Sequence, residues 1–288
     1  MVGLMFVVIT DFILAVPTAA ANALVIVAIL TTSSLQKPSY LLLTNLAFSD
    51  LAVGLFCQPG FAVLIIMKLF ENVQFDYSFL LIVIIVSSLL SCVSVLTATT
   101  ISVDRYLAIR LKMRYRSVVT LRRVRLFCVF SWVSPPVATF AMILLSIPSL
   151  DGILGVIAVT GSLTVIVVSY TMSFRALKIH CAQTQPQGNQ QPNSTTQSNS
   201  IDVLKYRKLL NTMVVIVVVI VICYLPMLGV LALFVQADPE NFVVIWGLMS
   251  IVCVNSTLNP VIYLTRMKDI REACVQILRK LFKFMQTD

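Results

Sequence analysis

Seven long apolar runs, separated by polar segments, constrain this chain more than any other feature of its sequence. A helix needs ~20 residues to cross ~30 Å of hydrocarbon, and every run is at least that long. The runs lie at about 4–30, 39–66, 78–109, 124–147, 152–178, 210–235 and 242–264. Most of the connecting segments are too short to form a soluble domain, so we expect residues 1–288 to form a single all-α membrane domain, a bundle of seven helices.

The composition agrees with this prediction, since 59% of the residues are hydrophobic, 11% are charged and the mean hydropathy is +0.96. A soluble domain of this length is much less apolar. Only the turn-rich pentapeptide Pro148–Gly152 divides the fourth and fifth runs, and we expect it to form a very short loop. No basic region with a small-residue cleavage site precedes the first run, which predicts an uncleaved signal anchor.

Basic residues predict the orientation of the bundle, because they favour short cytoplasmic loops. All of the 21 lysines and arginines except Lys68 fall on one side, which is therefore the predicted cytoplasmic side. The amino terminus is then extracellular and the carboxyl terminus cytoplasmic. The opposite side carries the acids Asp11, Glu71, Asp76, Asp151, Asp238 and Glu240. The net charge of +9 thus reflects topology and anionic membrane lipid rather than nucleic-acid binding.

Two segments outside the runs have their own character. The segment 181–201 is rich in Gln, Asn, Ser, Thr and Pro, so we expect a disordered third cytoplasmic loop. The segment 266–283 repeats apolar residues at helical spacing beside basic ones, which predicts an amphipathic helix on the inner leaflet. The seven cysteines all lie in runs or cytoplasmic segments, which argues against a disulfide framework.

Polar residues inside apolar runs are costly and therefore candidates for function. The main ones are Asn22, Asn45, Asp50, Ser94, Asn255, Ser256 and Asn259. An ionised Asp50 near mid-membrane costs roughly 2.5 to 3.5 kcal/mol without partners, so these groups are expected to converge inside the bundle. They form either a static hydrogen-bonded clasp or a cluster whose hydration or ion occupancy changes during function. At the cytoplasmic end of the third run, the acid–arginine pair of Asp104-Arg105-Tyr106 predicts a switch.

Together these residues resemble the motifs of rhodopsin-like (class A) G-protein-coupled receptors, and the resemblance covers nearly the whole chain. The resemblance rests on the order in which the motifs occur along the seven runs. The matching residues are Asn22 with Val25, Asn45-Leu46-Ala47-Phe48-Ser49-Asp50-Leu51, Asp104-Arg105-Tyr106, Trp132, Tyr170, Cys223-Tyr224-Leu225-Pro226 and Asn259-Pro260-Val261-Ile262-Tyr263. The resemblance implies a receptor in the plasma membrane, not an enzyme, that acts on a heterotrimeric G protein.

The resemblance also implies roles at the cytoplasmic end. Asp104 holds Arg105 at rest, and on activation Arg105 turns toward Tyr170 and Tyr263 and meets the tail of Gα. The sixth run swings outward about the kink at Pro226, because proline removes a backbone hydrogen bond. Met113 matches the apolar loop position that is pressed into the G protein. The basic residues from Arg110 to Arg125 serve that contact or anchor the loop to lipid headgroups.

Two further sites are implied by the same resemblance. A sodium ion is expected at Asp50, Ser94, Asn255 and Asn259, although Leu90 removes one frequent polar neighbour. The amphipathic segment corresponds to the short eighth helix of the family, and Cys274 within it is a candidate for palmitoylation.

Departures from the family pattern point to one branch. The usual disulfide between the third run and the second extracellular loop has neither partner here, since Leu80 holds one position and the loop has no cysteine. Ser162 replaces the usual proline of the fifth run. These features and the loop 113–123 resemble the melanocortin, lysophospholipid, cannabinoid and adenosine branch, melanocortin receptors most of all. The acidic ligand-binding positions of melanocortin receptors are replaced by Gly60, Leu80 and Ile84.

The ligand pocket implied by the resemblance is apolar with a few hydroxyls. It comprises Cys57, Ser87, Ser91, Leu154, Tyr224, Met227, Leu231, Trp246, Met249 and Cys253. Ser87 replaces the aspartate of amine receptors, Cys253 the lysine of opsins, and Leu231 an asparagine of adenosine receptors, whereas Asp11 matches an acidic position of that last group. The pocket therefore predicts a neutral, hydrophobic ligand, with a peptide read by the acidic rim as the alternative.

Two substitutions predict ligand-independent signalling. Tyr224 replaces a tryptophan that reports pocket occupancy, and Tyr206 replaces an acid that often locks Arg105. Two other functions remain open, a transporter or channel and a receptor that binds without coupling. Neither inverted repeats nor paired broken helices favour the first, and Arg105, Tyr170 and Tyr263 weigh against the second. The single histidine, His180, has no catalytic group around it in the sequence.

Overall fold

The computed structural model describes residues 2–70, 77–145, 148–184, 214–215, 218–219, 221–225, 228 and 242–286, and within them all regular structure is helical. This confirms the predicted all-α fold. The long helices are α1 (Val2–Thr31), α2 (Pro38–Ala52), α3 (Gln58–Leu69), α4 (Tyr77–Leu111), α6 (Leu121–Leu145), α7 (Pro148–Thr184), α9 (Phe242–Arg266) and α10 (Lys268–Met285). The short elements are η1 (Ser33–Leu35), η2 (Val53–Cys57), η3 (Lys112–Arg114) and α5 (Tyr115–Val118).

Six helical segments of the described residues are long and apolar enough to cross a membrane. They are Gly3–Thr31, Pro38–Leu69, Tyr77–Val118, Leu121–Ala141, Gly155–Ala176 and Trp246–Arg266. The remaining predicted span, 210–235, lies largely outside the described residues, and those of its residues that are described are helical.

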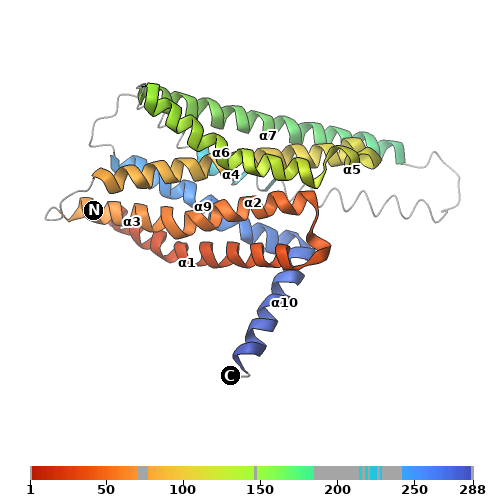
Figure 1. Cartoon of the computed structure of the whole chain (residues 1–288), viewed down its shortest axis with the longest axis horizontal. Coiled ribbons are helices and arrows are strands. Elements are labelled where there is room, and N and C mark those ends of the chain that lie inside the picture. Colours follow the sequence, from red (N-terminus) through yellow and green to blue (C-terminus); the bar gives the residue numbers. More distant parts are fainter. Residues whose placement is uncertain are drawn as a thin grey trace.

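The spanning helices run side by side along one axis (Figure 1). On one side, α1 packs against α2, α3 and α9, and across the bundle α4 packs against α2, α6 and α7. Large apolar side chains such as Phe6, Phe56, Phe130 and Phe140 remain exposed on the outside. In a water-soluble protein such surfaces would associate, whereas here they suit contact with lipid tails.

The second span is bent by a wide turn. α2, the π-helical turn η2 and α3 are continuous, and Pro59 follows that turn. Proline has no N–H to give to the carbonyl four residues earlier, and a π turn accommodates such a break. Beside the turn, Gly54 lies against α1, where an added Cβ would be 2.8 Å from the backbone nitrogen of Ala19. Small residues permit such close approach between membrane helices.

Polar side chains join helices within the apolar bundle. Asn45 of α2 donates its amide to Thr97 of α4 at 2.8 Å and to Ser131 of α6 at 3.3 Å. Its carbonyl oxygen accepts the indole N–H of Trp132 at 3.0 Å. One side chain thus joins three spans through interhelical hydrogen bonds, which replace the water that is absent from hydrocarbon.

The structure corrects the prediction for the connection between the fourth and fifth spans. Residues 148–152 do not form a loop but are the first residues of α7. Proline is well suited to a first helical turn, because its missing N–H would have no partner there. The predicted disordered loop 181–201 likewise begins inside α7, which continues to Thr184, and the rest of that loop lies outside the described residues.

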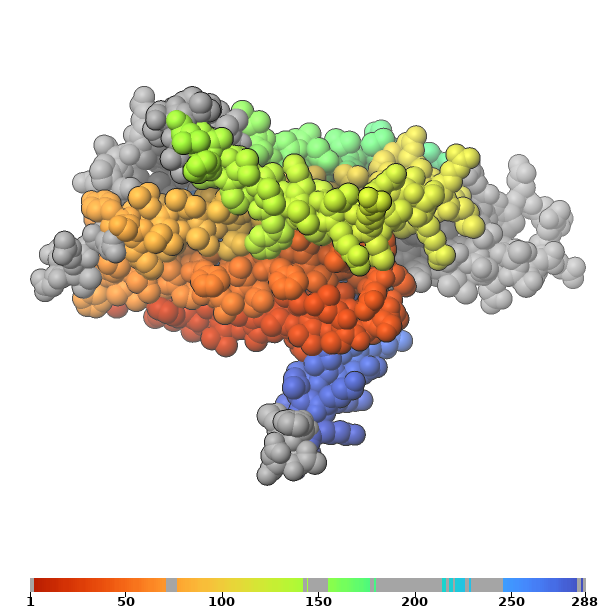
Figure 2. All heavy atoms as spheres, in the orientation of Figure 1, coloured from red at the N-terminus to blue at the C-terminus, as the bar shows by residue number. Residues whose placement is uncertain are grey.

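The helix α10 covers the predicted amphipathic segment and leaves the bundle at a steep angle to the spanning helices (Figures 1 and 2). Ile270, Ala273 and Cys274 are buried at its base. Further along, Leu278, Leu281 and Phe282 are exposed. This arrangement is typical of a helix that lies on a membrane surface.

Candidate functional site

Asp104, near the cytoplasmic end of α4, is the centre of a hydrogen-bonded cluster. Its carboxylate accepts from Arg105 Nε at 2.9 Å, from the Ser39 hydroxyl at 3.0 Å and from the Tyr115 hydroxyl at 2.6 Å. The second guanidinium nitrogen, Nη2, contacts both Asp104 and Ser39. Asp104 is buried and Arg105 is nearly so, and the ion pair is therefore shielded from solvent. Ion pairs that are exposed to solvent are weak. The pairing is the one that the family resemblance implies.

Sequence reasoning missed Ser39 and Tyr115. Ser39 is the second residue of α2, after Pro38, and Tyr115 opens the loop helix α5. The chain reaches α5 through Lys112, whose φ of 45° lies in the left-handed region that non-glycine residues seldom adopt. This turn folds Tyr115 back toward Asp104. The only signal in the sequence was a tyrosine eleven residues after an acid, and that spacing specifies no contact.

Of the other predicted switch residues, the structure describes all except Pro226. Tyr170 and Tyr263 are both buried, and the Tyr263 hydroxyl has no hydrogen-bond partner among the described residues. Met113, which the resemblance predicts to contact the G protein, is 93% exposed on η3. Tyr106 accepts a hydrogen bond from Arg110 at 2.7 Å. Pro226 and Tyr206 lie outside the described residues.

Pro260 of α9 frees a backbone acceptor inside the bundle. Because proline has no N–H, the carbonyl of Ser256, four residues earlier, loses its helical partner. The Asn22 side chain of α1 donates to this carbonyl at 3.2 Å and to the Thr18 carbonyl at 2.9 Å. Asn22 therefore ties α1 to the proline break in α9.

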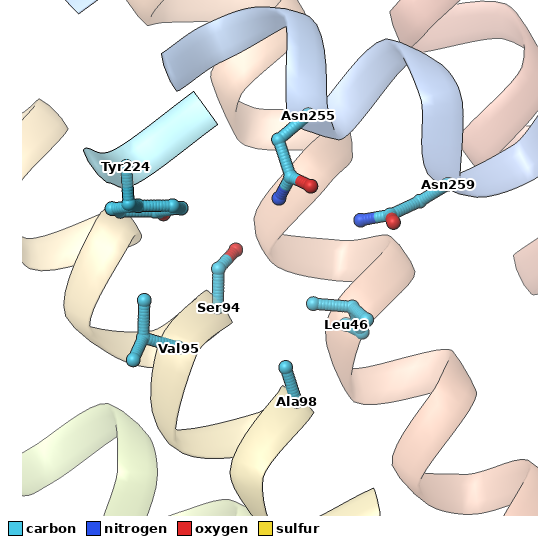
Figure 3. Close-up of a pocket in the computed structure, with 7 residues that line it drawn as sticks. All are labelled: Leu46, Ser94, Val95, Ala98, Tyr224, Asn255 and Asn259. Atoms are coloured by element: carbon cyan, nitrogen blue, oxygen red, sulfur yellow. The ribbon is translucent and has the colours of Figure 1, made fainter. Parts of the chain in front are cut away.

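Asp50 is fully buried at the centre of the bundle. Its two carboxylate oxygens accept from Asn259 Nδ2 at 2.8 Å and from the Ser94 hydroxyl at 3.4 Å, and Ser94 also bonds Ser49 at 3.0 Å. Within the described residues, the amide oxygens of Asn255 and Asn259 have no hydrogen-bond partner. Figure 3 shows Ser94, Asn255 and Asn259 converging from α4 and α9 on one small pocket.

The predicted sodium ligands are thus brought together, and their chemistry fits a hard cation. They supply a carboxylate, a hydroxyl and two amide oxygens that lack a partner in the described structure. Hard cations prefer such oxygen ligands. The remaining walls of the pocket are Leu46, Val95, Ala98 and Tyr224, which would keep competing water away.

The structure brings only some of the predicted ligand-pocket residues together. Cys57, Trp246 and Cys253 are buried in one apolar cluster with Phe61, Val83 and Leu90, and Met249 packs against it. Ser87 is buried and donates its hydroxyl to the Val83 carbonyl of its own helix at 2.7 Å, and Ser91 is half-buried.

We call this group the outer cluster, and Tyr224 is not part of it. Tyr224 belongs to a second apolar cluster, the inner cluster, which also contains Val95, Tyr170 and Tyr263. Met227, Leu231 and the side chain of Leu154 lie outside the part of the chain that is described.

Asp11, one of the acids predicted on the side opposite the basic residues, is buried inside the bundle. It lies within α1 and is 1% exposed, and its Oδ2 accepts the Ser250 hydroxyl of α9 at 2.6 Å. This burial depends on which face of α1 meets α9, and charge counting does not consider that face.

Cys274, the candidate for lipidation, is 2% exposed. Burial raises the pKa of its thiol to about 11. An acyl acceptor must present an accessible thiolate, so acylation at Cys274 would require the base of α10 to move away from the bundle.

Comparison with known proteins identifies a family, and the relatives that match include adenosine and adrenergic receptors. The family model described as "7 transmembrane receptor (rhodopsin family)" matches residues 21–150 and 149–263. Over 126 residues the chain is 37% identical to the adenosine receptor A2b of Canis lupus familiaris and 36% identical to that of Homo sapiens. Over 313 aligned residues it is 27% identical to the alpha-1D adrenergic receptor of Mus musculus.

These matches are unequal in extent. The adenosine receptor matches cover 43% of this chain and 36% of each receptor, and the adrenergic match covers 90% of this chain and 55% of that receptor. The chain therefore spans little more than a third to about half of the length of these relatives.

Proposed function

Because the chain belongs to the rhodopsin family of seven-transmembrane receptors, we propose that it couples an extracellular ligand to nucleotide exchange on a cytoplasmic heterotrimeric G protein. The protein is a multi-pass membrane protein. We place it in the plasma membrane with its amino terminus outside, since the seven-span prediction puts all lysines and arginines except Lys68 on one side. Within the family we assign it to the melanocortin, lysophospholipid, cannabinoid and adenosine branch, and the similarity to adenosine receptor A2b supports that assignment.

The observation that carries the proposal is the restrained arginine. Arg105 is held by Asp104 and Ser39 at the cytoplasmic end of α4, while Tyr263 keeps a buried hydroxyl without a partner among the described residues. A buried hydroxyl without a hydrogen bond costs ~1–3 kcal/mol. Release of Arg105 toward Tyr170 and Tyr263 would satisfy that group and free the guanidinium for Gα.

For the ligand, the outer cluster supports a largely hydrophobic molecule. Cys57, Phe61, Trp246 and Cys253 form a buried apolar surface with Met249 at its edge. Small-molecule sites are commonly apolar with few polar groups. In the alternative, a basic peptide read by an acidic rim, Asp11 would act from inside the bundle, because it is buried between helices.

The proposal is tested by replacing Arg105. Full-length wild-type receptor and Arg105→Ala are reconstituted in lipid nanodiscs, and nucleotide exchange is measured on a panel of Gα subunits. Wild-type receptor should accelerate exchange on at least one Gα without added ligand, and Arg105→Ala should not, since the group that meets Gα is gone.

Arg279→Ala is the matched control, because it makes the same change of charge on an exposed side chain of α10. Its exchange rate should equal that of wild type. Acceleration by Arg105→Ala equal to wild type, or no acceleration by wild type over empty nanodiscs with every Gα and a broad ligand set, would refute the proposed coupling.

A further inference from the structure

One acidic group in the outer half of the bundle takes no part in the switch. Asp11 is the tenth residue of α1 and faces α9, where Ser250 donates its hydroxyl to Asp11 Oδ2 at 2.6 Å. The hydroxyl of Ser250 on α9 thus contacts a carboxyl group that is buried in the outer half of the bundle.

Among the residues that the structure describes, no basic side chain forms an ion pair with this acid. In the described part of the chain, the ion pairs are Arg105 with Asp104 and Lys268 with Glu272, both at the cytoplasmic end. Lys68 is the one basic residue on the outer side of the bundle, and its side chain is exposed. A lone carboxylate in such a place is costly. An added cation would remove that cost.

The surroundings of Asp11 belong to the candidate ligand pocket. Ser250 lies one helical turn from Trp246 and three residues from Cys253, and both of these side chains are in the outer apolar cluster. Ser250 also contacts the Trp246 carbonyl at 3.1 Å. Trp246 therefore lies one helical turn along α9 from the residue that contacts Asp11, and the face of an aromatic ring attracts organic cations.

A buried acceptor without a partner among the described residues lies on the same side of α9. Gln58, fully buried, points its amide nitrogen at Thr257 at 3.4 Å, and Thr257 bonds Thr18 of α1 at 2.6 Å. The Thr18 hydroxyl donates to the Leu14 carbonyl at 2.6 Å. In this series of hydrogen bonds the side-chain donors have partners, whereas the Gln58 oxygen Oε1 has no partner among the described residues. The Asp11 carboxylate of α1 and the Gln58 oxygen of α3 are thus both hydrogen-bond acceptors close to α9, and a ligand with a hydrogen-bond donor would suit them.

We propose that Asp11 is the recognition residue for a ligand that carries a protonated amine on a hydrophobic body. The inference rests on the proposed receptor function and changes one part of it, the charge of the ligand. The ammonium group would bind Asp11 beside Trp246, and the hydrophobic body would lie against Cys57, Phe61 and Cys253. Ser250 orients the carboxyl group from α9.

The test compares matched amines and alcohols on the full chain in nanodiscs. The probes are a set of arylalkyl amines, such as 4-phenylbutylamine, each paired with the alcohol of the same length, such as 4-phenylbutan-1-ol. Dissociation constants are measured from ligand-dependent shifts of the melting temperature. At least one amine should bind wild type about tenfold or more tightly than its alcohol, the ratio expected from ~1.4 kcal/mol of charge pairing.

Asp11→Asn should remove this preference for the amine and leave the alcohol unchanged, whereas Asp11→Glu, which keeps the charge, should retain part of it. Asp269→Asn, the same change on α10 at the cytoplasmic end, should bind both probes like wild type. If Asp11→Asn does not fold, Ser250→Ala replaces it and should reduce the preference several-fold.

Binding of the alcohols as tightly as the amines, binding of neither, or an amine preference that survives Asp11→Asn would each overturn the inference. The Arg105-dependent nucleotide exchange of the proposed function is measured in parallel on the same preparations. A receptor that activates Gα through Arg105 but shows no Asp11-dependent amine binding would contradict this inference alone and leave the proposed coupling intact.

Discussion

At the scale of single residues, two threonines of α4 isolate the contribution of one interhelical hydrogen bond. Thr97 and Thr99 each donate a hydroxyl to the carbonyl four residues earlier, at 2.7 Å in both cases. Thr97 in addition accepts the Asn45 amide of α2 at 2.8 Å. Replacement by valine keeps the shape and removes the hydroxyl, so the two variants differ mainly in that bond.

Thr97→Val is expected to lower the free energy of unfolding by roughly 0.6 to 1.7 kcal/mol, the range measured for hydrogen bonds between membrane helices. Thr99→Val should leave it nearly unchanged, because its hydroxyl serves only its own helix. Denaturation in mixed micelles measures both. Equal losses in the two variants would mean that Asn45 finds another acceptor when Thr97 is removed.

Asp104→Asn tests how strongly the resting state depends on one ion pair. The pair with Asp104 is the only one that Arg105 makes among the described residues, and Tyr206 replaces the acid that often provides a second. Loss of the charge weakens the restraint on Arg105. If this costs ~1 kcal/mol, the ratio of active to resting receptor rises about fivefold.

Ligand-independent nucleotide exchange in nanodiscs measures that ratio. Glu272→Gln is the control, since Glu272 pairs with Lys268 at 3.4 Å on an exposed surface, where such pairs contribute little. Basal exchange by Asp104→Asn at or below the wild-type rate would show that the hydrogen bonds from Ser39 and Tyr115, rather than the charge, set the resting state.

At the scale of helices, Gly54 decides how closely the second span approaches the first. A Cβ at this position would be 2.8 Å from Ala19 N and 3.1 Å from Ala15 O, both backbone atoms of α1. Backbone cannot move aside as a side chain does. Gly54→Ala should therefore force α1 away and lower stability by ~1–3 kcal/mol, the usual cost of overpacking.

Gly247→Ala in α9 is the matched variant, because nothing lies within 4 Å of its added Cβ. Alanine favours helix over glycine by ~1 kcal/mol, so this variant should melt at or above the wild-type temperature. The order of the two melting temperatures in detergent is the decisive measurement, and the reverse order would show that α1 is free to shift.

The base of α10 is expected to protect Cys274. Burial raises the pKa of this thiol from 9.0 to about 11. The folded protein therefore disfavours the thiolate, and at pH 8 the thiolate fraction is roughly a hundredfold smaller than for a thiol of unshifted pKa. Maleimide labelling, read peptide by peptide in a mass spectrometer, should be slow at pH 8 and should keep accelerating well above pH 9.

Val275→Cys provides the comparison, because the neighbouring Val275 side chain is exposed. The new thiol should label much faster than Cys274 in the same molecule. Rapid labelling of Cys274 at pH 8 would instead indicate that α10 leaves the bundle often, which would also make Cys274 accessible to acylation.

The helices and the chemistry of the sites were predictable to different degrees. Apolar runs of helical length predicted the spans, because hydrocarbon admits few other structures. The end of one helix and the start of the next were not predictable at Pro148, where turn-forming residues also suit a first helical turn. The contacts of Ser39 and Tyr115 with Asp104 and the burial of Asp11 depend on which faces of distant segments meet, and no local pattern encodes that.

At the scale of the whole molecule, α9 links the outer pocket to the cytoplasmic switch. Trp246 and Ser250 face the outer cluster and Asp11, and two turns further the helix presents Asn255 and Asn259 to the Asp50 pocket. Tyr263, one turn after Asn259, ends in the buried hydroxyl beside the inner cluster. A shift of α9, which lacks one backbone hydrogen bond at Pro260, would move residues of the outer cluster, the Asp50 pocket and the cytoplasmic switch together.

The Asp50 pocket is therefore where a bound cation would bias the entire bundle. Sodium held by Asp50, Ser94, Asn255 and Asn259 would satisfy both amide oxygens that lack partners in the described structure and fix α2, α4 and α9 in the resting arrangement. Basal nucleotide exchange should fall when sodium replaces potassium at a constant ionic strength of about 0.15 M. If sodium binds only the resting state, a concentration equal to its dissociation constant shifts the population ratio about twofold.

Asp50→Asn removes the charged ligand and should make exchange independent of sodium. Ser49→Ala is the neighbouring control, because Ser49 bonds Ser94 at 3.0 Å without being one of the proposed ligands, and its sodium response should persist. Since the two salts match in ionic strength, screening of surface charges is the same in both. A response to sodium that is equal in wild type and Asp50→Asn would place the effect elsewhere, and no response in wild type would leave Asp50 with the static role of a clasp between α2, α4 and α9.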